Sequence, residues 1–438
     1  MSAQELAAAL DISIPTLHRL LKESSGQVLG AGKARRARYA LRRPLRGDYA
    51  ELPLYAVDAV GRAEQVAALA PVFPQGSSMD LAATGWPVPE ESRDGWWDGL
   101  PYPLYDMRPQ GYMGRQFARA EHRQLGVSNN PDEWGDDDIL FVLSRAGYDT
   151  SGNLILGDSA YERWQESKVA SREPLPEADV GEAYRLLAEQ AVASGVAGSS
   201  AAGEFPKFTA ARDLDGSATP HVIVKFSGAD NAPAVRRWAD LLVCEHLALE
   251  CASVLPGLQS AKSRVVTHAG RTFLEVERFD RHGAFGRSAL CSLATLNPAV
   301  IGADARDWGK LAARFVEAGL LAGEDGESIE YLWWFGRLIG NTDMHAGNLS
   351  FRPQGRLKLA PTYDMLPMMY APLPGGEVPQ RPFAPPLPLP PQREVWMRAC
   401  RAALAFWERT AADTRISADF RATCEANGQR LEELARHV

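Results

Sequence analysis

The sequence predicts an α+β protein in which a small winged helix-turn-helix module precedes a larger body of strands followed by helices. Three observations support this class. Residues 1–46 carry a charge opposite to that of the rest of the chain, strand-like runs gather between residues 205 and 280, and residues beyond 304 show mostly helical apolar spacing. With 438 residues the chain exceeds one ordinary domain, and a hydrophobic content of 45% lets it bury large cores.

Cysteine usage and hydropathy indicate a cytoplasmic protein. The number of cysteines, five, is odd, and no two of them have CxxC spacing. We therefore expect reduced, buried thiols rather than disulfides or a thiolate zinc site. The first residues, MSAQELAAALDI, lack the basic-then-apolar order of a signal peptide. No apolar run approaches the roughly 20 residues that span a bilayer. We therefore expect a cytoplasmic location and no membrane partner.

Shifts in composition divide the chain into four predicted domains. Residues 1–46 form the helix-turn-helix module. Residues 47–177, rich in Gly, Pro and Trp, form a subdomain that packs on the two lobes and shows no recognisable chemistry. Residues 178–285 form a lobe of strands and one long helix. Residues 286–438 form a mostly helical lobe, which is interrupted by the loop GNTDMHAGNLSF and by a proline-rich tract that is expected to be extended along the surface.

The first 22 residues have the pattern of a helix-turn-helix. AQELAAAL is one short helix, and after a turn the second helix begins with Ser13 as N-cap and Pro15 in the first turn, where its missing N–H costs little. The leucines of the second helix are expected to face the core: Leu17, Leu20 and Leu21. The remaining side chains point outward, as candidates to contact the major groove of DNA: Thr16, His18, Arg19 and Lys22.

A basic segment comes next and resembles a wing. Gly30 and Gly32 permit a tight turn in VLGAGKARRARYAL. The basic residues after them can contact DNA phosphates, which supply most non-specific affinity: Lys33, Arg35, Arg36 and Arg38. Residues 1–46 hold nine Lys and Arg against three Asp and Glu, a formal charge of +6, and leave −14 on the rest of a chain whose total is −8. We expect double-stranded DNA as the partner; the alternative is a solvated basic arm on an unrelated helical domain.

The loop NTDMHAGN, residues 341–348, carries a catalytic pattern. Asp343 is followed five positions later by Asn348, which is the D-x-x-x-x-N spacing of protein-kinase catalytic loops. Asp343 can accept or orient the proton of an attacking hydroxyl, and Asn348 can hold Mg²⁺ beside the phosphates. His345 is expected to have a structural, hydrogen-bonding role. A lone D-x-x-x-x-N arises often by chance. Its interpretation therefore depends on whether the other motifs of a phosphoryl-transfer site accompany it in the sequence.

Other parts of a phosphoryl-transfer site occur in kinase order. Asp364 in YDMLP can bind Mg²⁺ as a DFG aspartate does, although Phe-Gly is absent. Lys225 in the alternating run HVIVKFS fits a lysine that reaches nucleotide phosphates, and Glu245 in the next helix is its candidate partner. A glycine-rich loop before them can bring backbone N–H groups to phosphates: Gly195, Gly198 and Gly203.

Each of these residues also has an ordinary explanation. Lys225 could extend its amine to solvent, Glu245 could be a solvated helix residue, Asp364 a loop acid, and the glycines a flexible surface loop. The order of loop, lysine, helix glutamate, hairpin, D-x-x-x-x-N and aspartate nevertheless matches kinases throughout. We therefore predict phosphoryl transfer, with ATP and Mg²⁺ as cofactors.

At these residues the chain resembles the HipA-like kinases, the toxin component of bacterial toxin–antitoxin systems. The resemblance lies in SSAAGEFPKF, HVIVKFS, FLEVERFDR, NTDMHAGNLSF and YDMLP, and covers about residues 180–438. The leading helix-turn-helix makes the chain most similar to the YjjJ-type branch, which carries such a module in the same polypeptide. The resemblance implies a two-lobed HipA/protein-kinase-like fold and a serine/threonine kinase that transfers the γ-phosphate of ATP to a protein hydroxyl, with an antitoxin as a candidate partner.

The resemblance also implies a role for each motif residue. The catalytic base is Asp343, and the Mg²⁺ ligands are Asn348 and Asp364. Nucleotide contacts are implied for the glycine-rich loop, the first two strands and the hinge that holds adenine: Gly198, Ser200, Gly203, Lys207, Lys225, Glu277 and Phe279. Ser200 matches the loop serine whose autophosphorylation switches off family members, because a phosphate there adds negative charge beside ATP.

Two positions depart from the family pattern. Phe205 stands where the loop motif S-x-x-G-x-Q-P-K has Gln, and Gly347 stands where a Lys often precedes the catalytic-loop Asn. The second change removes a positive charge that could steady the transferring phosphate. Two alternative functions are a DNA-binding transcriptional regulator with a degenerate or nucleotide-sensing kinase-like domain, and a small-molecule kinase of the aminoglycoside or choline type. The latter shares the Asp–Asn spacing but not the segment EVERFDR.

Overall fold

The N-terminal module, residues 1–46, consists of two helices and a hairpin. The computed structural model describes all residues except 25, 33–36, 171–172 and 194–204. Helices α1 (Ala3–Ala9) and α2 (Ile14–Glu23) are followed by the antiparallel strands β1 (Val28–Ala31) and β2 (Arg38–Leu41). Ser13 caps α2 by accepting a hydrogen bond from the Thr16 backbone, as its position predicts. The two predicted helices are thus confirmed.

The core of this module is smaller than expected. Leu17 is 2% exposed, but Leu20 is 39% exposed, so the expectation that Leu20 faces the core is wrong. Leu21 is partly buried, and two short helices with a two-stranded sheet offer too little surface to cover Leu20 as well.

A middle region, residues 47–170, holds a five-stranded antiparallel sheet in the order β6-β5-β4-β3-β7. Its strands are β3 (Leu52–Val57), β4 (Ala63–Pro71), β5 (Ser77–Ser78), β6 (Trp96–Trp97) and β7 (Leu154–Leu156). Its helices are α3 (Tyr102–Asp106), α4 (Gly111–Leu125), α5 (Asp136–Ala146) and α6 (Asp158–Val169). The run DDDILFVLSR belongs to α5. Its three aspartates stand in the first helical turn, where negative charge is favourable.

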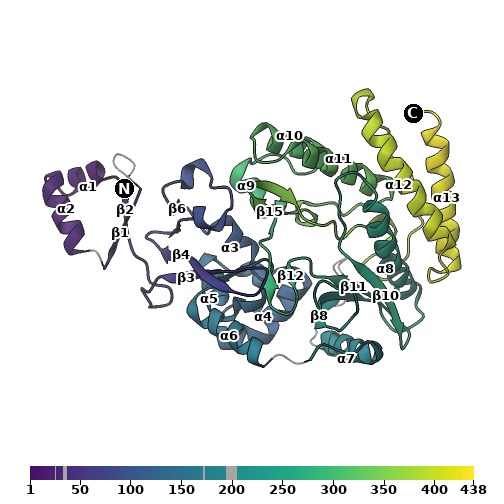
Figure 1. The fold of residues 1–438 in the computed structure, drawn as a ribbon, viewed down its shortest axis with the longest axis horizontal. Helices are drawn as coiled ribbons and strands as arrows, with labels where there is room; N and C mark the ends of the chain where they lie inside the picture. The colour runs from purple at the N-terminus through teal and green to yellow at the C-terminus, as the bar shows by residue number, and fades with distance from the viewer. Residues whose placement is uncertain (25, 33–36, 171–172, 194–204) are drawn as a thin grey trace.

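The N-terminal module is docked on the middle region through arginines. Arg42 pairs with Glu51, Arg46 with Asp138 at 2.7 Å, and Arg43 contacts Asp137. Part of the positive charge of residues 1–46 therefore compensates acids of the same chain. Figure 1 shows the module standing at one end of the molecule.

The strand lobe begins with α7 (Val180–Ala193) and holds an antiparallel sheet in the order β10-β11-β9-β8. The strands are β8 (Lys207–Ala211), β9 (His221–Phe226), β10 (Ser263–His268) and β11 (Arg271–Glu277), with the long helix α8 (Pro233–Ala252) between β9 and β10. Ala269 and Gly270 have φ of +47° and +77°, which places the predicted hairpin turn between β10 and β11. The short pair β12 (Arg281–His282) and β13 (Gly286–Arg287) comes after β11.

The helical lobe packs around large aromatic side chains. It comprises α9 (Leu293–Val300), α10 (Trp308–Glu317), α11 (Gly323–Leu338), α12 (Arg393–Ala412), α13 (Ala418–Ala435) and the small sheet β14 (Cys291–Ser292), β15 (Ser350–Gln354) and β16 (Arg356–Leu359). Trp308, Trp396 and Trp407 are fully buried. Helices α8, α12 and α13 lie together at the end opposite the N-terminal module (Figure 1).

Two further expectations concern the whole chain. All five cysteines are buried free thiols, as the sequence predicts. In the part of the chain that the structure describes, no helix combines the length and the apolar character needed to cross a membrane.

Candidate functional site

A cavity of about 520 Å³ opens where the strand lobe, the helical lobe and the middle region meet. Seven residues that the sequence placed in the site or singled out line it together: Lys207, Lys225, Glu245, Glu277, Phe279, Gly347 and Asp364. The fold therefore gathers residues that are up to 157 positions apart in sequence around one cavity.

Lys225 is the centre of a buried ion cluster in this cavity. Its Nζ donates to both carboxylate oxygens of Glu245 at 2.7 and 2.8 Å, and also contacts Asp364. Lys225 is 6% exposed and Glu245 is fully buried, because β9 turns Lys225 toward α8. The predicted pairing of Lys225 with Glu245 is thus confirmed.

Burial and charge act against each other in this cluster. Burial would lower the pKa of the Lys225 amine, but Asp364 and Glu245 outweigh it and hold this pKa above its ordinary value. Burial would raise the pKa of Asp364, but Lys225 and then Lys207 lower it to about 2. Burial raises the pKa of Glu245 despite the nearby lysine. Lys225 is therefore cationic and Asp364 ionised at neutral pH, charges that can meet a phosphate and a divalent cation, respectively.

Backbone geometry fixes Asp364 and Lys207 around Lys225. Asp364 has φ of +53°, a conformation that non-glycine residues seldom adopt and that occurs mainly where surroundings impose it. The Asn341 side chain donates to the Asp364 carbonyl at 3.5 Å. Lys207 stands directly opposite Lys225 in the β8–β9 register, so that two ammonium groups come from neighbouring strands.

The catalytic-loop pattern lies between α11 and β15. The Asp343 backbone N–H donates to the Asn341 side chain at 3.0 Å, and the Asp343 side chain is exposed and outside the cavity lining. His345 caps the short 3₁₀ turn Ala346–Asn348: its Nδ1 accepts from Gly347 N–H at 3.0 Å, and buried Asn348 accepts from His345 N–H at 2.9 Å. These bonds fit the structural role predicted for His345.

The two departures from the family pattern have local explanations. A Cβ on Gly347 would stand 2.9 Å from the His345 ring, so a larger residue there requires the ring to move. Phe205 is 6% exposed and packs edge-to-face on Trp238 of α8, with ring centroids 4.6 Å apart. The aromatic residue therefore anchors the start of β8 in the apolar core.

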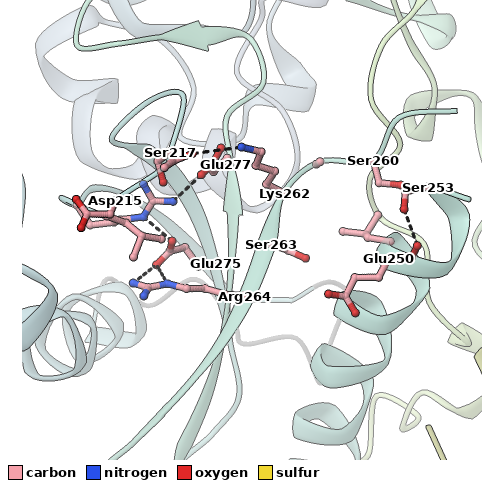
Figure 2. Close-up of a pocket in the computed structure, with 15 residues that line it drawn as sticks. Asp215, Ser217, Glu250, Ser253, Ser260, Lys262, Ser263, Arg264, Glu275 and Glu277 are labelled. Carbon is pink, nitrogen blue, oxygen red and sulfur yellow. Dashed lines mark hydrogen bonds and ion pairs between the residues drawn. The ribbon is translucent and has the colours of Figure 1, made fainter. Parts of the chain in front are cut away.

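The segment that runs from the last residue of β11 to the first residue of β12, residues 277–281, is called the hinge segment here. The Glu277 carboxylate accepts from Arg212 at 3.1 Å, and the Phe279 carbonyl accepts from Arg352 at 2.6 Å. The Phe279 ring lies 5.7 Å from that of Tyr363, whose hydroxyl donates to the Gly347 carbonyl at 2.6 Å. Glu277 also borders a second cavity, of about 450 Å³, where polar side chains of β10 and β11 converge (Figure 2).

The oxygen ligands that Asn348 and Asp364 offer are too few to hold Mg²⁺ unless phosphate oxygens complete its coordination. Among the described residues, no group of three or more His, Cys, Asp and Glu could hold a metal alone. Mg²⁺ in nucleotide sites is typically held by one or two protein oxygens together with phosphates and water, and Asn348 and Asp364 can supply those two.

Several predicted residues lie outside the described part of the chain. From the glycine-rich loop these are Gly195, Gly198, Ser200 and Gly203; from the wing they are Lys33, Arg35 and Arg36. The other predicted DNA contacts of the second helix, Thr16, His18, Arg19 and Lys22, all belong to α2. The Thr16 hydroxyl lies 2.9 Å from the hydroxyl of the N-cap Ser13. Arg38 stands 3.5 Å from Asp94 of the middle region.

The middle region contributes to the cavity in a way that the sequence did not predict. Met113 and Phe117 of α4 and residues 147–151 after α5 line it together with residues of the hinge segment. No local pattern in these residues indicates a ligand, since they are apolar or loop residues in a stretch rich in Gly and Pro.

Comparisons with known proteins agree with this arrangement. Residues 48–165 match the family model of the YjjJ-like toxin middle domain, and residues 199–432 match that of the HipA-like C-terminal domain. The chain is 35% identical over 441 residues to Toxin YjjJ of Escherichia coli K12, a match that covers 100% of this chain and 96% of the relative.

The fold is also similar to HipA of Shewanella oneidensis MR-1, solved in a complex with HipB and its operator DNA. The TM-score is 0.50 at 16% identity, and the match covers 88% of this chain and 99% of the other. This likeness confirms the predicted two-lobed, HipA-like α+β fold. Given the full-length relationship and the two matching family models, the chain belongs to the YjjJ-like toxins of the HipA-like family.

Proposed function

We propose that this protein is a serine/threonine protein kinase of the toxin type, which transfers the γ-phosphate of ATP to a hydroxyl of a cytoplasmic protein. The observation that carries the proposal is the buried cluster in which Lys225 contacts both Glu245 and Asp364 within a cavity bordered by the hinge segment. Protein kinases use a strand lysine paired with a helix glutamate, and an aspartate that binds magnesium, in this way.

Each residue has a defined part in this mechanism. Lys225 and Lys207 neutralise phosphate oxygens, and the pairing of Lys225 with Glu245 fixes the direction of its amine. Asn348 and Asp364 would hold Mg²⁺, which offsets the negative charge that gathers on the phosphates. Asp343, whose side chain is exposed, orients the acceptor hydroxyl and takes its proton. Glu277 and Phe279 border the adenine.

Incubation of the purified protein with Mg-[γ-³²P]ATP tests the proposal. We expect acid-stable label on serine or threonine of the protein itself or of proteins in a cell extract. The alternative, a regulator with a degenerate domain, predicts nucleotide binding without transfer. The Gly347 and Phe205 departures are compatible with either result, so turnover decides between them.

We also propose that residues 1–46 bind double-stranded DNA. His18, Arg19 and Lys22 belong to α2, and the second helix of such a motif is the one that enters a major groove. HipA of Shewanella oneidensis was solved with HipB and operator DNA, which makes an antitoxin a further candidate partner.

Changing Arg35, Arg36 and Arg38 together to Ala should weaken binding to all DNA sequences. The slope of log K against log salt concentration should become less steep by the contribution of up to about three phosphate contacts. Arg19→Ala should instead change the sequence preference, because a helix side chain in the groove contacts base edges. Gel shifts across a salt series measure both effects. If the unaltered protein binds no DNA at low salt, the module has another role.

Ser200 is proposed as an autophosphorylation site that silences the enzyme. It lies in the glycine-rich segment seven residues before Lys207. A phosphoserine carries about −1.5 to −2 charges at neutral pH and would repel ATP from the neighbouring phosphate site. Mass spectrometry should find phosphate on Ser200 in the wild type but not in Asp343→Ala. An unmodified Ser200 in an active kinase would refute this role, and phosphate on Ser199 would move it by one residue.

A further inference from the structure

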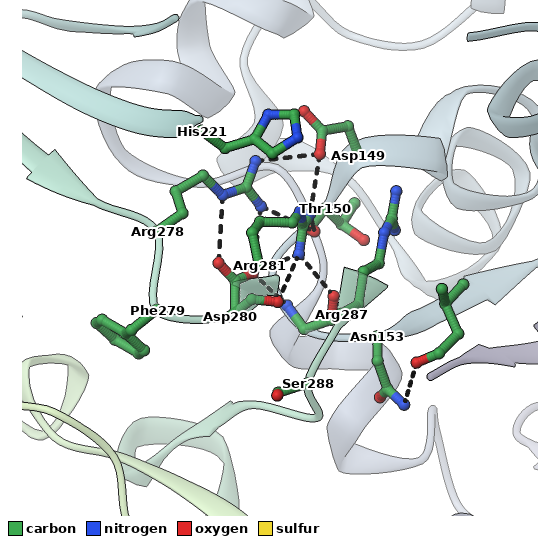
Figure 3. A network of polar contacts seen from close by, with 12 residues as sticks. Asp149, Thr150, Asn153, His221, Arg278, Phe279, Asp280, Arg281, Arg287 and Ser288 are labelled. Carbon is green, nitrogen blue, oxygen red and sulfur yellow. Dashed lines mark hydrogen bonds and ion pairs between the residues drawn. The ribbon is translucent and has the colours of Figure 1, made fainter. Parts of the chain in front are cut away.

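The middle region binds the hinge segment from outside the two lobes (Figure 3). Asp149, in the loop after α5, accepts hydrogen bonds from Arg278 at 3.0 Å and from Arg281 at 2.8 Å. The carbonyl of the next residue, Thr150, accepts from the same two arginines, at 3.4 and 2.7 Å. One short loop therefore binds both arginines that flank Phe279 and Asp280.

The two arginines and Asp280 are buried, whereas the Asp149 side chain that contacts them is 49% exposed. Arg278 and Arg281 are 8% and 3% exposed, and Asp280, 5% exposed, accepts from both and from the Gly152 backbone N–H at 2.9 Å. Arg287, which is 5% exposed, adds a third buried arginine to this cluster, and Asp280 supplies only one negative charge. Asp149 supplies the second. Because a buried charge without its partner is costly, loss of Asp149 would alter the preferred position of both arginines.

The loop that holds the arginines is also a wall of the proposed nucleotide cavity. Tyr148, Asp149 and Thr150 line it together with Met113 and Phe117 of α4, facing the hinge segment. In Figure 3 the Phe279 side chain points away from the ion cluster. The contacts of Asp149 with Arg278 and Arg281 therefore join this wall of the cavity to the segment that carries Phe279.

We propose that Asp149 is a positioning residue of the nucleotide site, which fixes the middle region as a third wall of the cavity and holds the hinge segment through Arg278 and Arg281. The identity of the ligand as a nucleotide rests on the proposed function. The residue acts through the arginines, so its effect falls on nucleotide affinity rather than on the transfer step.

Nucleotide binding and kinetics of Asp149→Ala test the proposal. We expect the Kd for Mg-ADP, measured by calorimetry, and the KM for ATP to rise about tenfold, with kcat within about twofold of the wild type. Asp149→Asn keeps a hydrogen-bond acceptor but loses the negative charge, so its Kd and KM should rise less than those of Asp149→Ala. If Asp149→Ala fails to fold, Asp149→Asn takes its place in the test.

Asp137→Ala is the matched control. Asp137 is also an acid of the middle region that contacts an arginine, and its side chain is 45% exposed compared with 49% for Asp149, but its partner Arg43 lies in the N-terminal module. We expect wild-type Kd and KM in this variant. An equal rise in both variants would reveal a general loosening of the middle region and overturn the proposal, as would unchanged Kd in folded Asp149→Ala and Asp149→Asn.

The two proposals can fail separately. A wild-type protein that binds Mg-ADP but transfers no phosphate would disprove the kinase activity, and the Kd comparison would still decide the role of Asp149. A wild-type protein that binds neither ADP nor ATP would overturn both.

Discussion

Asp343→Ala should reduce phosphoryl transfer by about 10²- to 10⁴-fold, the range in which a positioned general base contributes. The fold should survive, because the Asp343 side chain is exposed and its backbone N–H keeps the bond to Asn341. The affinity for Mg-ADP should also be unchanged, since the side chain lies outside the cavity lining. Rates of label transfer from [γ-³²P]ATP, together with calorimetric binding of ADP, measure the two effects separately.

Thr342→Ala is the control for this variant. Thr342 is the exposed neighbour of Asp343 in the same loop, so its replacement tests whether any change in the loop lowers the rate. We expect near wild-type transfer. Normal labelling by Asp343→Ala would reject the base assignment, and equal loss in both variants would mean that the loop conformation, rather than the carboxylate, is what matters.

The sequence predicts those parts of the molecule whose signals are local. Lys225 stands out as a charged residue in an alternating strand, and Ala269–Gly270 marks a turn between two apolar runs; both occur in the structure as predicted. The D-x-x-x-x-N loop is local in the same sense. Its catalytic role remains a prediction, because geometry alone does not test chemistry.

The features that the sequence did not reveal depend on contacts between distant residues. Asp149 and Arg278 are separated by 129 positions, and no periodicity connects a loop acid with a hinge arginine. The basic charge of residues 1–46 is a second case in which the sequence does not reveal contacts between distant residues. Composition counts Arg43 and Arg46 as available for DNA, whereas the fold pairs them with acids at the start of α5.

Lys225→Met should abolish detectable ATP turnover and destabilise the fold. The variant removes the cation that contacts the phosphates and leaves Glu245, fully buried, beside Asp364 without the ammonium group that both carboxylates contact. Breaking a buried pair by removing one member costs about 3–5 kcal/mol. Urea denaturation at pH 7 measures this loss. Lys262→Met, at an exposed lysine next to β10, should leave the free energy of unfolding near the wild-type value.

The pH dependence of unfolding should reverse in this variant. In the wild type the pKa of Asp364 lies near 2, below the ordinary value of about 3.9, so its stabilising contribution is present above pH 4 and is lost as the pH falls toward 2. Without Lys225, burial and the mutual repulsion of the two carboxylates should raise their pKa values. Lys225→Met should then gain stability relative to the wild type as the pH is lowered from 7 to 5.

A second substitution separates stability from catalysis. In the double variant Lys225→Met/Glu245→Leu the buried pair is replaced by apolar side chains, an exchange that is often neutral in other proteins. We expect most of the lost stability to return, while ATP turnover stays absent because no ammonium group remains on β9 to meet the phosphates. If turnover returned with stability, Lys225 would serve only the fold, and the phosphate contact would have to be assigned to Lys207 on the neighbouring strand.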